Sequence, residues 1–229
     1  MMTSHRGIGF WYNIALVSFM GIAITLAATI MASGFSSSDA TKEVLEEALD
    51  ESRHGLQIVG KISARADVTS DKLLITGTPI TAASGGSVDI KQDYFKINYK
   101  LIKIDSHTIT YDDINAGSLN EGSYNSMQTA VADAKASGLI DVNPYVDEEK
   151  PKRTTAFIYW LVNFDNDGKI DVGELAILAI VYAEQDRPST GEYILVEGLV
   201  PEGSILFMER TIANISDVVV DLGGKIKAE

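Results

Sequence analysis

The chain has 229 residues, and its 32 acidic against 19 basic side chains give a formal net charge of -13. An acidic surface without a basic stripe repels phosphate backbones, so nucleic acid is excluded as an expected partner. Cysteine is absent, which excludes disulfides, thiolate metal ligands and a cysteine nucleophile. The length suits one ordinary domain joined to a long helix.

The first element in chain order is an uncharged run, because residues 7–38 contain no Asp, Glu, Lys or Arg. As a helix, this run exceeds the roughly 20 residues that cross a bilayer. Arg6 precedes the run, and residues 39–51 after it are rich in Asp and Glu. This asymmetry favours an inserted chain with its amino terminus inside and nearly all of the remainder outside.

Three interpretations of the uncharged run stay open. A secretory signal has a shorter apolar core of about 7–15 residues, followed by a cleavage site. In this chain, that cleavage site would fall near residues 32–34. A signal anchor would keep the run in the membrane. A prepilin-type signal would be cut before the run and would leave it on the mature chain. The junction of Arg6-Gly7 with Ile8 resembles the basic-glycine junction of archaeal flagellins and type IV pilins, which implies a leader over residues 1–7 and processing at Gly7 and Ile8.

The uncharged run and the amphipathic residues after it together predict one long helix over residues 8–55. About 45 residues of helix span about 70 Å. Small residues recur four apart, as at Ala23 and Ala27, and this spacing lets neighbouring helices approach closely. The second half is amphipathic, and Gly55 is the expected stop. Such a helix can lie in lipid before assembly and then bury the same apolar surface against identical copies. A monomeric membrane anchor would tolerate the same small residues.

Residues 56–229 show the periodicity of strands, with turns rich in Gly, Ser, Asn and Asp. One helix interrupts them near residues 124–136, with Gly138 as its stop. The pattern indicates an α+β chain, in which a long hydrophobic N-terminal helix precedes an all-β sandwich. The predicted strands cover residues 56–64, 72–77, 93–105, 107–113, 154–164, 174–183, 191–199, 204–212 and 215–222.

Residues 163–174 match the register of an EF-hand calcium loop. Oxygen-bearing side chains fall at positions 1, 3, 5, 9 and 12, and glycine falls at position 6 for the sharp bend. Because a strand is predicted before the loop, we expect a Ca2+-binding loop that joins strands and no EF-hand domain. The alternative is a plain hairpin turn in which Asp, Asn and Gly serve the backbone. The candidate metal residues are Asn163, Asp165, Asp167, Lys169, Asp171 and Glu174.

Two further features bear on function. Asn214, followed by Ile and Ser, forms an N-x-S sequon that would carry a glycan in a secreted chain, although it falls in a predicted strand region. His54 and His107 are isolated, and no nucleophile-elbow, zinc-protease, P-loop or dinucleotide motif is present. The sequence therefore gives no specific support to an enzyme, and we expect none.

Several segments together resemble the archaeal flagellin (archaellin) family, which is related to type IV pilins. The resemblance covers the basic-glycine junction, the apolar helix, the DNDG turn at residues 165–168, and the Glu209-Arg210-Thr211 triplet before a closing apolar strand. It implies a long helix joined to an immunoglobulin-like antiparallel β-sandwich, packed into an extracellular helical filament that a membrane motor turns for swimming. The implied partners are identical or paralogous subunits, a prepilin-type peptidase, a membrane assembly motor, and the lipid bilayer before assembly.

Two other functions stay open beside the motility filament. An adhesive type IV pilin would share the helix and its assembly, but the Glu-Arg-Thr triplet favours the flagellin. A membrane-anchored extracellular module or hydrolase that depends on Ca2+ would share the anchor and the loop. Such a module would stay monomeric in detergent, whereas a filament subunit would shear from cells as polymer.

Overall fold

The computed structural model describes residues 55–83, 86–120, 122–201 and 205–224. The predicted leader, its processing site at Gly7 and Ile8, and the predicted helix up to residue 54 lie outside the described residues. No helix within the described ranges has the length and apolar character that a membrane span requires. The outer region described below is rich in β-structure, as the sequence predicts.

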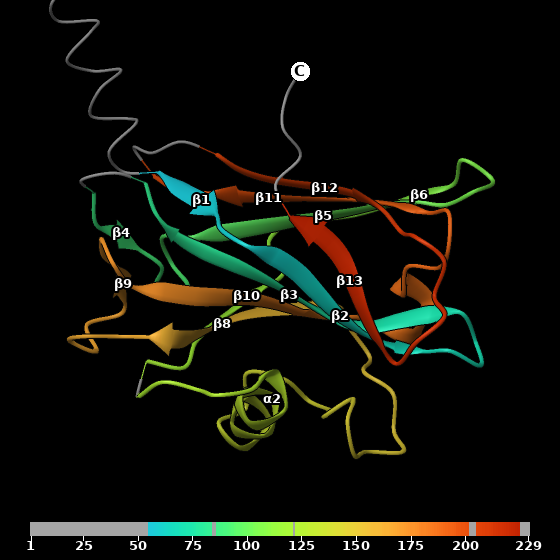
Figure 1. Cartoon of the computed structure of the whole chain (residues 1–229), viewed down its shortest axis with the longest axis horizontal. Helices are drawn as coiled ribbons and strands as arrows, with labels where there is room; N and C mark the ends of the chain where they lie inside the picture. Colours follow the sequence, from blue (N-terminus) through green and yellow to red (C-terminus); the bar gives the residue numbers. More distant parts are fainter. Residues whose placement is uncertain (1–54, 84–85, 121, 202–204, 225–229) are drawn as a thin grey trace, which may run out of the picture. The chain divides into compact units, whose positions relative to one another are not determined.

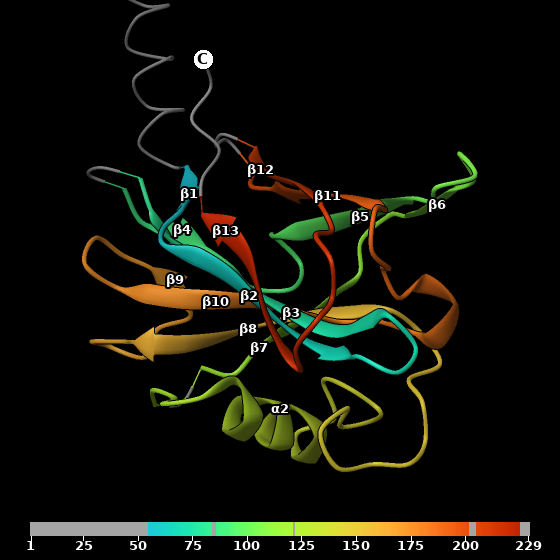
Figure 2. The same cartoon turned by 45° about the vertical axis from the view of Figure 1, so that its right-hand side comes forward.

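Two sheets pack face to face, and a helix covers the outer side of the larger one (Figures 1 and 2). Six strands of the seven-stranded sheet follow the order β13 (Val219–Gly224), β2 (Lys61–Asp67), β3 (Lys72–Ala82), β10 (Leu175–Val181), β8 (Thr155–Val162) and β7 (Asn115–Ser118). The seventh strand, β1 (Leu56–Ile58), also pairs with β3. The four-stranded sheet runs β12 (Leu206–Thr211), β11 (Tyr193–Leu199), β5 (Lys96–Ile102) and β6 (Thr108–Tyr111). The remaining described elements are the ribbon of β4 (Val88–Asp89) with β9 (Lys169–Ile170), helix α2 (Met127–Ala136) and the 3-10 turn η1 (Glu184–Asp186).

One strand pair departs from the predicted antiparallel sandwich. Strands β7 and β8 are parallel neighbours, with Asn115 opposite Ala156, whereas the other paired strands of the two sheets are antiparallel. Parallel neighbours need a crossover connection of a dozen or more residues. The chain between β7 and β8 supplies that connection, since it contains α2. The helical insertion and the parallel pair are thus one feature.

The main core lies between the two sheets and contains the largest fully buried side chains, among them Trp160, Tyr99 and Tyr182. Strands β2, β5, β11 and β12 alternate between buried and exposed residues, because only one of their faces meets this core. Strands β8 and β10 are instead buried on nearly every residue. They lie in the middle of the seven-stranded sheet, which has a covered face on each side.

Helix α2 forms a second core with the outer face of the seven-stranded sheet. Ala130, Val131 and Ala134 are its buried residues, and Ser126 caps its start by accepting a hydrogen bond from the Thr129 N–H at 3.2 Å. The helix approaches the sheet closely over Gly77, where a Cβ would lie 2.5 Å from the Met127 Cε atom. The predicted helix near residues 124–136 is therefore confirmed, and its small residues let it sit flat on the sheet.

Several predicted strands have other bounds in the structure; β3, for example, runs to Ala82 and not to residue 77. The run predicted over residues 56–64 is broken at Gly60, whose φ of 76° turns the chain between β1 and β2. The last strand begins at Val219 and not at residue 215. The Ile215 N–H donates to the Thr190 hydroxyl at 3.2 Å, so a side chain and not a neighbouring strand holds the backbone there.

Candidate metal centre

The loop from Asn163 to Glu174 connects β8 to β10 and has strands on both sides, as expected for a strand-joining loop. Its middle is held by the short β9, in which Ile170 pairs with Val88 of β4. Both side chains are buried in the main core. The loop is therefore anchored at three places: its two ends, and Ile170 between them.

Short polar side chains bend the first half of the loop through hydrogen bonds to the backbone. The Asn163 Oδ1 atom accepts from the Asn166 N–H at 2.9 Å, and the Asp165 Oδ1 atom accepts from the Asp167 N–H at 3.2 Å. Asn166 and Gly168 both adopt positive φ, 60° and 80°, which Asn and Gly tolerate best. These bonds fit a metal loop and a plain turn equally well.

Three carboxylates converge inside the bend. Oxygen atoms of Asp165, Asp171 and Glu174 all lie within 4.8 Å of one another, and they form the one acidic group of this kind that the described residues contain. Neither Lys169 nor any other lysine of the described ranges forms an ion pair with them. Two unit charges about 4 Å apart repel by about 1 kcal/mol in water and more where the dielectric is lower. A hard divalent cation ligated by carboxylate oxygens would relieve that repulsion.

Glu174 is the most constrained member of the cluster, with only 2% of its surface exposed. Its Oε1 atom accepts from the Phe164 N–H at 2.7 Å, and its Oε2 atom accepts from the Asp171 N–H at 3.0 Å. Its carbonyl oxygen accepts from the Thr81 hydroxyl of β3 at 2.7 Å. The Glu174 carboxylate is thus held by backbone N–H groups of the loop, and its backbone carbonyl is held by the sheet.

The other predicted metal residues occupy different positions. Asp167 is exposed, stands outside the carboxylate cluster, and accepts from the Lys169 N–H at 2.8 Å through Oδ1. Lys169 lies on β9, where its register partner is Asp89. Asn163 serves the first bend through its side-chain oxygen. The structure brings together three of the six predicted residues as a carboxylate group, and metal binding itself stays a prediction.

The predicted glycosylation residue lies in an accessible place. Asn214 is exposed and belongs to the connection between β12 and β13, so its assignment to a strand region was wrong. Ser216 of the same sequon is exposed as well. An exposed loop is where a glycan can be attached without displacing packed side chains.

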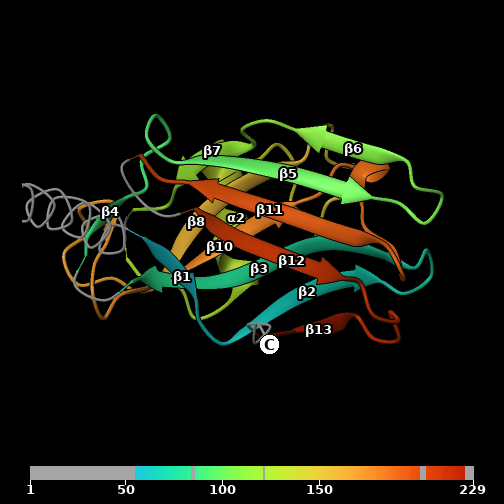
Figure 3. The same cartoon turned by 90° about the horizontal axis from the view of Figure 1, so that it is seen from above.

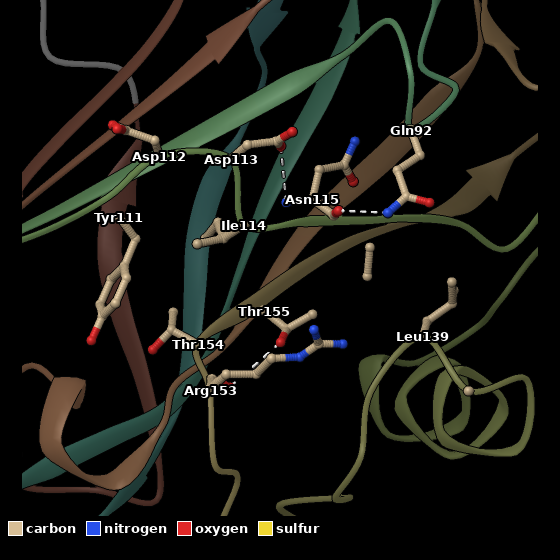
Figure 4. A pocket seen from close by; sticks show the side chains of 12 residues that line it. Gln92, Tyr111, Asp112, Asp113, Ile114, Asn115, Leu139, Arg153, Thr154 and Thr155 are labelled. Atoms are coloured by element: carbon tan, nitrogen blue, oxygen red, sulfur yellow. Dashed lines mark hydrogen bonds between the residues drawn. The ribbon is translucent and has the colours of Figure 1, made fainter.

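A separate polar pocket of about 450 Å3 lies between the β6–β7 connection, the start of β8 and the residues after α2 (Figure 4). Part of its polar lining holds the backbone. The Gln92 amide donates to the Asn115 carbonyl at 3.1 Å, and the Asp113 Oδ1 atom accepts from the Asn115 N–H at 3.3 Å. Sequence reasoning did not find this pocket, because its lining comes from four separate segments.

Comparison with known proteins gives matches at the level of structure. No model of a known protein family matches the chain, and no curated sequence does. The archaeal flagellin FlaB1 from Methanocaldococcus jannaschii is similar with a TM-score of 0.53 and 17% identity, covering 74% of this chain and 97% of that one. The archaeal flagellum of Methanospirillum hungatei strain JF1 matches at a TM-score of 0.43 and 14% identity, covering 95% and 99%. The archaellum periplasmic stator protein FlaG from Sulfolobus acidocaldarius matches at 0.34 and 8%, covering 67% and 96%.

The likeness to FlaB1 spans nearly the whole of that structure and about three quarters of this chain. At this identity, the shared property is the fold, which is the level at which the resemblance drawn from the sequence is confirmed. The chain has the fold of an archaeal flagellin.

Proposed function

We propose that this chain is a structural subunit that polymerises into an extracellular archaeal flagellum filament. The observation that carries the proposal is a combination: an outer domain with the fold of an archaeal flagellin, attached to an uncharged segment over residues 7–38. The segment would leave lipid and bury its apolar surface against identical or paralogous copies. A peptidase of the prepilin type, a membrane motor and the bilayer are its proposed partners before and during assembly.

The proposal includes an immunoglobulin-like fold for the outer domain and a long N-terminal helix. Two antiparallel sheets packed over a shared core support a sandwich of that kind. Residues 8–55 would form the rod that holds neighbouring copies together, with the outer domain carried on its polar end. The adhesive pilin is the second candidate, and the flagellin-like fold of the outer domain favours the motility filament over it.

The filament proposal is tested by N-terminal sequencing of material sheared from cells. We expect long fibres whose subunits begin at or near Ile8, because the proposed cleavage follows Gly7. In parallel, the membrane fraction should contain unprocessed protein that begins at residue 1 or 2. Subunits that retain residues 1–7, or protein that stays dispersed in detergent and never forms fibres, would contradict the proposal.

We further propose that the loop from Asn163 to Glu174 binds Ca2+ through Asp165, Asp171 and Glu174. Extracellular calcium modules typically bind with dissociation constants of about 10⁻⁴–10⁻³ M. At about 10–100 mM Ca2+, which is 100 times these dissociation constants, binding stabilises the folded state by about 2.7 kcal/mol. For a chain of this size that corresponds to a rise in Tm of about 5–10 °C.

The calcium proposal predicts a specific loss in a double variant. In Asp165→Asn/Asp171→Asn, the rise in Tm with Ca2+ should disappear, since two of the three carboxylates are lost. The matched control is Glu148→Gln/Glu149→Gln, which removes two exposed carboxylates elsewhere and should keep the full rise. Thermal unfolding and calorimetry of the full chain in detergent measure both. A wild-type chain without heat or stabilisation at Ca2+ concentrations up to about 100 mM would leave the plain turn as the correct interpretation.

A further inference from the structure

The outward face of the four-stranded sheet is uncovered by any described segment (Figure 3). The seven-stranded sheet differs, because α2 packs on its outward face (Figure 1). We call the outward-pointing residues of β12, β11, β5 and β6 the open face. Tyr193, Leu195, Leu199 and Phe207 point outward there, and none of them belongs to either hydrophobic core. The Phe207 side chain is the most open example, with 52% of the residue's surface exposed.

The open face also carries basic side chains that have no partner within the domain. Lys96 and Lys100 lie four residues apart on β5, which places them about 13 Å from each other. Neither forms an ion pair or a side-chain hydrogen bond within the described ranges, whereas Lys135 and Lys150, on the α2 side of the domain, pair with carboxylates. In a chain with a net charge of -13, two unpaired lysines beside apolar side chains suit an acidic partner.

Carboxylates lie on the same face, but no ion pair of the described residues joins one of them to these lysines. Burial and the neighbouring Glu209 carboxylate of β12 raise the pKa of Tyr193. Glu197 and Asp112 line a shallow pocket of about 200 Å3 together with Lys100, yet neither forms an ion pair with it. The pocket therefore offers a cation and two carboxylates to groups of another molecule.

The size of the open face indicates what covers it. Four strands about 4.8 Å apart and seven residues of about 3.3 Å each give a projected area of about 400 Å2. A stable pair of proteins buries about 800 Å2 of accessible surface on each partner. Side-chain relief makes the accessible area of the open face larger than its projected area, so the face is at the small end of such interfaces and would bind weakly from dilute solution. It suffices where another element already holds the partner nearby at high effective concentration.

We propose that the open face is a contact between the outer domains of neighbouring copies of this chain, in which Lys96 and Lys100 meet carboxylates of the next acidic copy. The inference rests on the proposed function, because the rod formed by residues 8–55 would supply the high effective concentration. Subunits that all point one way in a filament make heterologous contacts. The open face of one copy thus meets a different surface of the next.

Charge reversal tests the proposal in the full chain expressed in cells. In Lys96→Glu/Lys100→Glu, we expect the yield of sheared filament to fall at least tenfold, while the detergent-dispersed protein keeps the Tm of the wild type. The matched control is Lys152→Glu/Arg153→Glu, which changes the net charge equally at two exposed residues off the open face. The control should assemble within twofold of wild type. Normal assembly of the first variant, or equal loss in both, would overturn the contact.

A labelling experiment separates a second copy from the chain's own N-terminal residues as the cover. Because the chain has no cysteine, Thr110→Cys places a single thiol at an exposed residue beside the shallow pocket. We expect it to react at least ten times more slowly in filaments than in detergent-dispersed protein, while Val146→Cys reacts at similar rates in both. Protection of the thiol already in dispersed protein would show that the chain covers its own face. Equal labelling in both forms, or equal protection of both thiols, would also reject the proposal.

The two proposals fail in distinguishable ways. A wild-type chain that forms no filament refutes the proposed function, and the contact falls with it. Wild-type filaments that assemble equally well with and without Lys96 and Lys100 leave the function intact and refute only the contact.

Discussion

The Ala134→Asp substitution should detach α2 from the seven-stranded sheet and lower the free energy of unfolding by about 3–5 kcal/mol. Ala134 is fully buried between the helix and the sheet, within the cluster that contains Phe157 and Ile177. A carboxylate there would lose its hydration without gaining a cation, since that cluster consists of apolar side chains. On the same helix, Ala132 is exposed, so Ala132→Asp serves as the matched control.

Thermal unfolding of the full chain in detergent, followed by circular dichroism, measures this difference. The buried substitution should lower Tm on the order of 10 °C. The control should lower the free energy of unfolding by less than about 0.7 kcal/mol, the largest cost that helix propensity alone gives. Equal losses at the two positions would show that α2 contributes through its own helicity and that the second core contributes little.

The sequence anticipated those elements whose residue pattern is long enough to be periodic. The alternation in 93–105 and 107–113 predicted two strands, which pair as β5 and β6. Helix α2 was predicted from its own spacing of small apolar residues. Strands β4 and β9 were missed, because two residues cannot show a period, and their pairing depends on contacts 80 residues apart in the chain.

The second core could have been inferred from the composition of two strands. Strands β8 and β10 are apolar on both faces, which is the pattern of a strand covered on each side. One helix and two such strands imply a third layer. The parallel pairing of β7 could not be inferred, since β7 reads NAGS and has no apolar pattern.

The sequence predicted those features of the candidate metal site that depend on local spacing and missed those that depend on contacts with other strands. Ligand spacing in a loop is local, so Asp165, Asp171 and Glu174 converge as the EF-hand register implies. The anchoring of Glu174 is not wholly local, because its backbone carbonyl accepts from the Thr81 hydroxyl of β3. The Asp167 side chain accepts from the Lys169 N–H and lies outside the cluster, which the spacing of the loop does not decide.

A buried carboxylate joins the two sheets at the turn between β10 and β11. Asp186 of η1 is fully buried, and it accepts hydrogen bonds from the Tyr111 hydroxyl at 3.0 Å and from the Thr154 hydroxyl at 2.7 Å. Figure 4 shows the hydroxyl ends of Tyr111 and Thr154 directed to the same side of the pocket. The Tyr99 hydroxyl donates to the Asp186 carbonyl at 3.0 Å, and burial raises the pKa of Tyr99, which keeps it a donor. Donors from β5, β6 and the start of β8 thus meet on one residue.

The Asp186→Ala substitution should lower the free energy of unfolding by about 3 kcal/mol, because two hydroxyls lose their acceptor in a buried place. The matched control is Glu184→Ala in the same turn. Glu184 forms an exposed ion pair with Lys150, and such pairs are worth about 0–1 kcal/mol. Chemical unfolding of both variants by urea at neutral pH gives the comparison. Equal losses would show that Asp186 does not join the sheets.

A double-mutant cycle decides whether the hydroxyls act through Asp186. Thr154→Val removes one donor without changing the side chain's shape, and we expect a loss of about 1–2 kcal/mol. Combined with Asp186→Ala, the second loss should be smaller by about 1 kcal/mol, because the bond it removes is already absent. The Thr154 hydroxyl also accepts from the Ala183 N–H at 3.1 Å, so some of its loss should persist in the double variant. Strict additivity would mean that Thr154 stabilises the turn through Ala183 alone.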